Sequence, residues 1–199
     1  MQPRAPGGAP LMGVAPEPGP SEAPNLLIRP LGSAPETVAG LAELLIEAAA
    51  SGASVSFMHP LEPEIAAAFW TRSLVAADAG ERVVLGAFEC AQLVGTVTLL
   101  LDFPPNQPHR GEIAKLLTRL SHRRRGIARA LMLEAERIAV ARGRTLLTLD
   151  TGTDDGAGPL YEKLGFTRAG VIPEYAYKPY GGLQGTIIYW KRIAPPCST

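Results

Sequence analysis

A basic turn that contains glycine and joins a strand to a helix constrains this chain more than any other feature. Residues 112–120 form a largely apolar segment, and the turn that follows reads Arg-Arg-Arg-Gly-Ile-Ala over 123–128. From 127 to 142 apolar residues recur at the spacing of one helix face. The first amides of such a helix have no partners inside it and lie at its positive end. We therefore predict that this turn binds an anion, and phosphate fits best.

The side chains of the turn support the same prediction. Gly126 and Ala128 are small, so an anion can approach the backbone closely. Arg123, Arg124 and Arg125 add charge-assisted contacts that can be bidentate. The alternative is a solvated basic turn before an ordinary surface helix, and the surrounding residues decide between the two.

The overall charge indicates that the arginine run is a local basic patch and not part of a nucleic-acid-binding surface. The chain has 19 basic and 19 acidic residues and a formal net charge of +0, whereas nucleic-acid-binding domains are usually basic. Cys90 and Cys197 form no CxxC pair, which favours a reducing compartment. The sequence shows no bilayer-spanning apolar run and no signal-peptide pattern. We therefore expect a cytoplasmic protein without nucleic-acid or membrane partners.

The first residues differ in composition from the rest of the chain. Prolines stand at 3, 6, 10, 16, 18, 20 and 24, among many Gly and Ala. Such a segment cannot bury enough apolar surface to offset the entropy lost on ordering. We predict a disordered leader over 1–24 and one folded domain over 25–195. Met12 leaves a later start site open.

The periodicity of the remaining chain predicts a mixed α/β domain. Helices over 36–50 and 62–79 precede strands over 82–89 and 93–101, which a tight turn joins. A strand over 112–117, a helix over 127–142 and a strand over 145–150 form a crossover, so part of the sheet is parallel. The other expected elements are a strand over 26–29, a short helix over 159–164, and strands over 167–171 and 187–191.

Two motifs at a defined spacing connect the chain with a known superfamily. Arg123, Gly126 and Ala128 match a pyrophosphate signature of Arg or Gln, two residues, Gly, one residue, and Gly or Ala. Tyr161, followed by Glu-Lys-Leu-Gly-Phe, matches a second signature one helix and one strand further on. Residues 82–191 therefore resemble the GNAT superfamily of acyl-CoA-dependent N-acetyltransferases. The resemblance implies a mixed, twisted sheet of six to seven strands with helices on both faces, acetyl-CoA as cosubstrate, and no metal.

Four further segments resemble the tabtoxin-resistance-like branch of this superfamily: residues 54–61, 109–116, 147–151 and 173–176. This branch implies a small amine as acceptor, such as an amino-acid-like toxin or antibiotic, and a monomer or homodimer. Two alternatives stay open. One is acetylation of a protein or peptide amine, and the other is a non-catalytic module that senses acyl-CoA.

Amine acetylation needs proton transfers, and three residues are candidates for them. An alkyl amine has a pKa of about 10, so the enzyme must take a proton from it at neutral pH. Glu112 before the turn and Asp150 at the end of the next strand are the candidate bases; Asp150 is alternatively an anchor for the substrate ammonium. The ordinary structural alternative for Glu112 is an ion pair with Lys115 or Arg110, and for Asp150 a capping role. Tyr161 is the candidate proton donor to the departing CoA thiolate, or else a packed aromatic ring.

The remaining candidates bind acetyl-CoA or the acceptor. In the superfamily, a bulge in the strand before the turn frees an amide for the oxyanion, and the same strand pairs with pantetheine. The resemblance places this bulge around Leu117 or Thr118. Phe57 and His109 are candidates for the acceptor pocket, and the alternative for His109 is a loop hydrogen bond. A positive φ at Arg124, where the superfamily often has glycine, would strain the backbone. The predicted acetyl-CoA-binding set is Leu117, Thr118, Arg123, Arg124, Arg125, Gly126, Ile127, Ala128 and Arg129.

Overall fold

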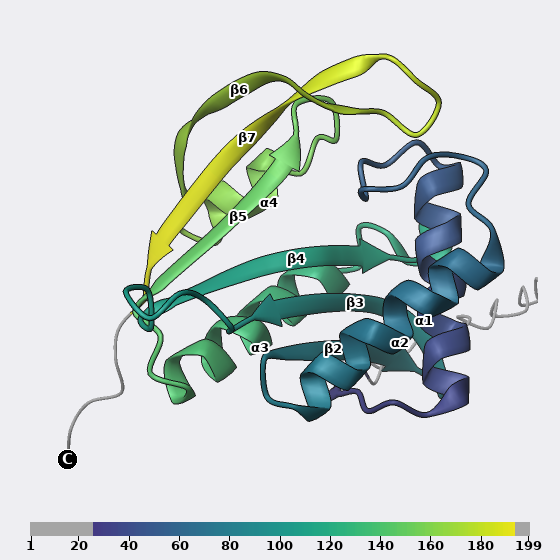
Figure 1. Ribbon diagram of the computed structural model, residues 1–199, viewed down its shortest axis with the longest axis horizontal. Helices are drawn as coiled ribbons and strands as arrows, with labels where there is room; N and C mark the ends of the chain where they lie inside the picture. The colour runs from purple at the N-terminus through teal and green to yellow at the C-terminus, as the bar shows by residue number, and fades with distance from the viewer. Residues whose placement is uncertain (1–25, 194–199) are drawn as a thin grey trace, which may run out of the picture.

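A seven-stranded sheet with the order β1-β2-β3-β4-β5-β7-β6 organises the molecule (Figure 1). The computed structural model describes residues 26–193, so the predicted leader over 1–24 and the last residues of the predicted domain lie outside the described residues. All neighbouring strands are antiparallel except β4 and β5, which are parallel. The strands are β1 (Leu27–Pro30), β2 (Arg82–Glu89), β3 (Gln92–Leu100), β4 (Arg110–Thr118), β5 (Leu146–Gly152), β6 (Thr167–Tyr177) and β7 (Leu183–Arg192). The predicted mixed sheet is confirmed.

Helices cover both faces of this sheet, as predicted. They are α1 (Pro35–Ala50), α2 (Pro63–Asp78), α3 (Ile127–Ala141) and α4 (Gly158–Lys163), with a short 3-10 turn at Leu120–His122. In Figure 1, α1 and α2 lie in front of the sheet and α3 lies behind it. Within residues 26–193, none of the helices is long and apolar enough to cross a membrane.

Two hydrophobic clusters hold the layers together. Seven successive residues of β3, from Leu93 to Leu99, are buried, because this central strand is covered on both faces. Trp70 anchors the cluster under α1 and α2, and Leu131 and Leu147 lie in the cluster under α3. Each fully buried leucine side chain stabilises the fold by about 2 kcal/mol.

The β6–β7 hairpin is longer than the sequence predicts. The expected strands 167–171 and 187–191 extend to Thr167–Tyr177 and Leu183–Arg192. Pro173 removes a backbone donor and therefore predicts the end of a strand, but β6 is an edge strand, where proline is tolerated. The register shifts between Ile172 and Ala176, and Glu174 in this irregular stretch has a φ of 51°. In Figure 1 the hairpin arches away from the sheet toward α1.

The parallel strands β4 and β5 pair over only part of their length. Their register runs from Arg110 opposite Leu146 to Ile113 opposite Leu149 and stops there. Beyond this point β4 stays paired with β3 up to Thr118, and β5 stays paired with β7. The two strands therefore diverge toward their carboxyl ends, and their facing edges form no ladder. Figure 1 shows this opening as a V between β4 and β5.

Candidate active site

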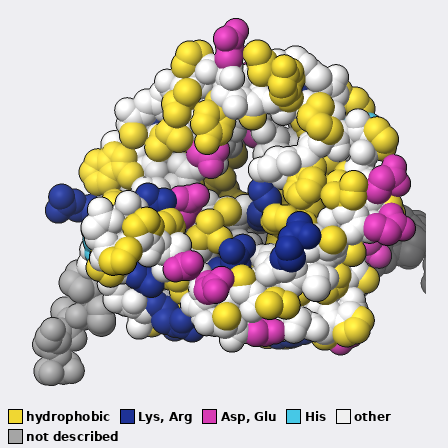
Figure 2. Space-filling model, viewed as in Figure 1, with side chains coloured by type: hydrophobic (Ala, Val, Ile, Leu, Met, Phe, Trp, Pro, Cys, Tyr) yellow, Lys and Arg dark blue, Asp and Glu magenta, His cyan; other side chains and the backbone are white. Residues whose placement is uncertain are grey.

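The divergence of β4 and β5 opens a cleft of about 930 Å³. Figure 2 shows the hollow at the centre of this face, with basic and acidic side chains around it. Five parts of the fold form its walls: the α1–α2 loop, β4, the turn into α3, the β5–α4 segment and the β6–β7 hairpin. The lining residues are among those of the segments 48–56, 113–118, 122–129, 150–163 and 175–186, although not every residue of these segments lines the cleft.

One end of the cleft is the amino terminus of α3. Gly126 precedes the helix with a φ of 82°, a conformation that glycine adopts without strain. The first backbone hydrogen bond of the helix runs from the Ala130 amide to the Gly126 carbonyl at 3.0 Å. The amides of Ile127, Ala128 and Arg129 precede that bond and have no acceptor inside the helix. A Cβ placed on Gly126 would meet nothing within 4 Å, so an anion has room against this backbone.

The three arginines of the turn have different surroundings. Arg123 and Arg124 line the cleft together with Arg129. Arg124 has a φ of 61°, the left-handed conformation that costs a residue other than glycine about 1–2 kcal/mol. Arg125 is not among the lining residues, because its Nη2 donates to Glu89 Oε1 at 2.6 Å. The structure therefore brings two arginines of the run to the cleft and points the third away from it.

A bulge in β4 lies where pairing with β5 ends. Ala114 is opposite Thr98 and Leu117 is opposite Thr96, so Lys115 and Leu116 together oppose the single residue between them on β3. Lys115 has a φ of 51° at this point. The sequence predicts the bulge at Leu117 or Thr118, one to two residues further on. Leu117 is instead buried in the cluster beneath α1 and α2, which holds its register with β3.

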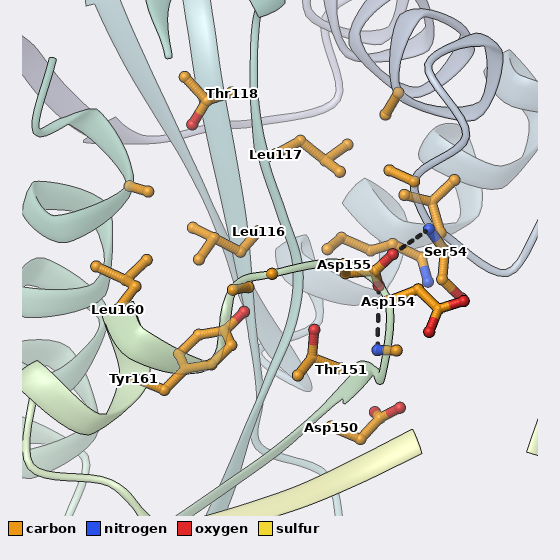
Figure 3. Close-up of a pocket in the computed structure, with 18 of the residues that line it drawn as sticks. Ser54, Leu116, Leu117, Thr118, Asp150, Thr151, Asp154, Asp155, Leu160 and Tyr161 are labelled. Carbon is orange, nitrogen blue, oxygen red and sulfur yellow. Dashed lines mark hydrogen bonds between the residues drawn. The ribbon is translucent and has the colours of Figure 1, made fainter. Parts of the chain in front are cut away.

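Tyr161 and Asp150 both line the cleft, as the sequence predicts. Tyr161 is 6% exposed and packs against the rings of Phe166 and Tyr189. Burial raises the pKa of the Tyr161 hydroxyl well above its ordinary value, and the carboxylates of Asp155 and Asp150 raise it further. The phenol therefore stays protonated and is able to donate. Figure 3 shows this hydroxyl pointing from α4 toward the space beside Leu116 and Thr151.

Asp150 lies on β5 just past the end of its pairing with β4. Its Oδ2 accepts a hydrogen bond from the Thr186 hydroxyl at 3.0 Å, and the residue is exposed. Leu149 before it is buried in the cluster beneath α3, so Asp150 points to the other face of the sheet, toward α1 and α2. A carboxylate held by one hydroxyl keeps its remaining lone pairs for an ammonium or a proton.

The structure does not bring Glu112, Phe57 or His109 to the cleft wall. Glu112 accepts a hydrogen bond from Arg110 at 2.6 Å, one of the two ion pairs proposed as its structural alternative. Phe57 packs edge-on against Phe69 with the ring centroids 5.3 Å apart. His109 is exposed at the start of β4, at the opposite end from the divergence. The position of a residue in the sequence does not reveal which neighbour its side chain contacts. Glu112 and Phe57 contact residues outside the cleft, and His109 lies away from it.

Several lining residues are not among the site residues that the sequence predicts. Asp155 accepts hydrogen bonds from the backbone amides of Ser54 at 3.3 Å and Gly152 at 3.0 Å, which joins the α1–α2 loop to the end of β5 (Figure 3). Lys115 and Gln184 also line the cleft. Lys115 lies in the segment 109–116 of the branch resemblance, but its contact with Ser56 and that of Asp155 with Ser54 come from segments far away in the chain, which no local pattern indicates. No group of three His, Cys, Asp or Glu side chains within residues 26–193 is arranged to hold a metal ion.

Comparison with known proteins identifies the family. Residues 40–166 match the family model described as acetyltransferase (GNAT) family. The chain belongs to the GNAT acetyltransferase family. The matched range includes the turn at 123–128, the bulge in β4, and Tyr161.

Solved structures share the fold of this GNAT domain. An N-acetyltransferase from Staphylococcus aureus Mu50 superposes with a TM-score of 0.73 at 19% identity, over 84% of this chain and 98% of that chain. A ribosomal-protein-alanine N-acetyltransferase from Brucella melitensis gives 0.71 at 19% identity, over 84% and 99%. The yncA protein of Salmonella typhimurium, solved with acetyl-CoA, gives 0.71 at 16% identity, over 87% and 96%.

The residues of this GNAT cleft fit acetyl-CoA. The free amides at the start of α3, with Arg123 and Arg129 beside them, suit a pyrophosphate. The unpaired edges of β4 and β5 suit an extended pantetheine arm, which would add to β4 as a strand does. The turn and the divergent strands thus each suit one part of acetyl-CoA.

Proposed function

We propose that this protein transfers an acetyl group from acetyl-CoA to a primary amine of a small molecule. The supporting observation is one continuous cleft that contains an anion-binding helix terminus at one end, a protonated phenol beside β4, and a carboxylate on β5. These are the groups that binding of a CoA thioester, protonation of its thiolate and deprotonation of an amine require.

In the proposed reaction the substrate ammonium first loses a proton to Asp150, directly or through a water molecule. The neutral amine nitrogen then attacks the thioester carbonyl carbon, and the developing oxyanion lies at the β4 bulge. Collapse of this intermediate breaks the C–S bond, and the Tyr161 hydroxyl donates its proton to the departing sulfur. The second proton of the nitrogen passes to solvent, from which Tyr161 is reprotonated. The products are an N-acetyl amide and CoA.

Transfer is proposed to be direct, within a ternary complex. Cys90 is the cysteine that the described part of the chain contains, and it is exposed in the turn between β2 and β3. It does not line the cleft, so it is not placed to carry an acetyl group. Glu112 stays a prediction as an alternative base, and its ion pair with Arg110 makes Asp150 the carboxylate we favour.

The far side of the cleft favours a small acceptor over a folded protein. The tip of the β6–β7 hairpin reaches α1, where the Tyr180 hydroxyl donates to the Ala50 carbonyl at 2.8 Å. The Pro179 carbonyl accepts from the His59 amide of the α1–α2 loop at 2.8 Å. The hairpin thereby spans the acceptor side and narrows access to it. This supports a small acceptor, and the tabtoxin-resistance-like resemblance suggests an amino-acid-like toxin or antibiotic.

An amine panel with acetyl-CoA tests the proposal, with CoA release and product mass as readouts. The double variant Asp150→Asn, Tyr161→Phe is expected to lose at least a hundredfold in kcat, because general acid and base groups each contribute about 10²-fold or more. Asp102→Asn, an exposed carboxylate outside the cleft, is the matched control and keeps activity. Tight CoA binding without an acetylated product on any amine would instead indicate a sensor module, and product only on peptides would indicate a peptide acetyltransferase.

A further inference from the structure

Lys115 is a partly buried cation in the cleft without a carboxylate partner. Its Nζ donates to the Ser56 hydroxyl at 2.9 Å and lies 5.7 Å from the centroid of the Phe69 ring. Among residues 26–193, the ion pairs of the structure do not include Lys115. An ammonium has three donors, so one neutral hydroxyl leaves donors unused at a place where water is partly excluded.

The β4 bulge determines where this side chain points. The φ of 51° at Lys115 breaks the alternation of β4, and both contacts of its Nζ come from the α1–α2 side of the sheet. Asp150 points to the same side from β5, across the divergence of the two strands. Tyr161 lies in the cluster on the opposite face, beneath α3. The cleft therefore has a cation and a carboxylate on the acceptor side and the thiolate donor on the other.

The other acidic residues of the cleft are already engaged. Asp154 forms an ion pair with Lys178 at 3.2 Å, and the two oxygens of Asp155 accept from the amides of Ser54 and Gly152. Burial lowers the pKa of Lys115 and the charge of Asp150 raises it, although no ion pair between the two is found among residues 26–193. The cation is therefore left for a ligand to neutralise.

A second polar side chain in the same cleft is also without a partner. Gln184 on β7 is 6% exposed, and neither its Oε1 nor its Nε2 has a hydrogen-bond partner in the described part of the chain. Buried polar groups are nearly always paired in native proteins. An amide that both donates and accepts, in the same cleft as a cation with unused donors, is typical of a site that orients a polar ligand.

We propose that Lys115, assisted by Ser56, binds an anionic group of the acceptor. The substrates are then primary amines that carry a carboxylate or a similar anion, and the inference assigns a specific residue to the anion of the amino-acid-like acceptor proposed above. The ammonium lies at Asp150 and the anion at Lys115, so the two opposite charges hold the acceptor in a single orientation. This inference rests on the proposed function, whose acceptor site it specifies.

Matched pairs of amines test the inference. Each pair consists of an α-amino acid and its methyl ester, which differ in the anion and share the amine. Wild-type protein is expected to prefer the acid. Lys115→Met keeps the apolar stem and removes the charge; it is expected to lower kcat/KM for the acid at least tenfold, mainly through KM, and to change kcat/KM for the ester less than twofold. Lys115→Arg is expected to restore part of the preference.

Lys178→Met is the control, because this lysine already pairs with Asp154 and does not line the cleft. It should leave the preference for the acid unchanged. An equal loss on acid and ester in Lys115→Met would overturn the inference and make Lys115 part of the general machinery. A wild-type protein that does not distinguish the two amines would overturn it as well.

Calorimetry separates this inference from the proposed function, because it needs no turnover. N-acetyl amino acids and their methyl esters are titrated into the CoA-saturated protein. Stronger binding of the acid, lost in Lys115→Met and kept in Lys178→Met, supports the anion site even if no amine is acetylated. Equal binding of acid and ester refutes the site even if acetylation is observed.

Discussion

Gly126 offers the most direct test of the anion-binding turn. Its φ of 82° and the open space around it mean that a side chain at this position strains the backbone but collides with nothing. Gly126→Asp places a carboxylate where the pyrophosphate of CoA is expected. Gly126→Asn has the same shape without the charge, and Asn and Asp tolerate the left-handed conformation better than other side chains. The difference between the two variants therefore isolates the electrostatic part.

The expected loss of CoA affinity follows from the repulsion between the introduced carboxylate and the pyrophosphate. Two unit charges about 5–6 Å apart repel by about 3 kcal/mol at an effective dielectric constant of about 20. Salt at physiological strength screens part of this repulsion at the rim of the cleft. At least about 1.4 kcal/mol should survive, which is a tenfold rise in the Kd for CoA. Gly126→Asn should raise the Kd less than about threefold, and both variants should lose about 1 kcal/mol of unfolding free energy.

Titration calorimetry with CoA measures both Kd values, and denaturant unfolding measures both stabilities. The gap between the Asp and Asn variants should shrink in high salt, because screening weakens only the charge term. Equal Kd values for the two variants would refute the reasoning, since the phosphates would then lie away from the start of α3. Loss of binding in both variants together with unfolding would indicate a structural effect of the backbone alone.

Three further predictions concern the same turn and the buried phenol. Arg123→Ala should weaken CoA binding in calorimetry at least fivefold more than Arg125→Ala, because Arg125 pairs with Glu89; equal losses would contradict the assignment. Arg124→Gly should raise the free energy of unfolding by about 0.5–1 kcal/mol, since it relieves the φ of 61°, yet weaken CoA binding through the lost charge; a less stable variant would contradict the strain. Burial raises the pKa of Tyr161 above its ordinary value of 10.0, so the stability that this residue contributes is present below pH 10 and is lost as the pH rises further. Tyr161→Phe should therefore flatten the alkaline fall in unfolding free energy between pH 9 and 11, and an unchanged fall would disprove the raised pKa.

Much of the fold could be predicted because its signals are local. The buried face of α3 and the tight turn between β2 and β3 each depend on residues within a few positions of one another. The crossover from β4 to β5 could be predicted because a helix between two strands usually joins parallel neighbours. The β6–β7 hairpin was predicted too short; β6 continues through Pro173, which an edge strand tolerates. Edge position is a property of the whole sheet.

In the candidate site, too, the residues placed by local patterns could be predicted, and those that depend on distant partners could not. The turn at 123–128, Asp150 and Tyr161 were predicted for the site and contribute to the cleft lining, because a motif or a strand end indicates their position. Glu112 and Arg125 were predicted for the site as well, yet each has an oppositely charged partner outside the cleft.

By itself the sequence determined the turn at the start of α3, the order of the elements and the family, because short-range periodicity and backbone conformation encode them. The tertiary structure alone decided which arginines line the cleft, where β4 bulges, and that Lys115 and Asp150 line the same cleft. The physical reason is that side-chain partners and strand register depend on segments distant in the chain. Ser56, for example, meets Lys115 across 59 positions of sequence.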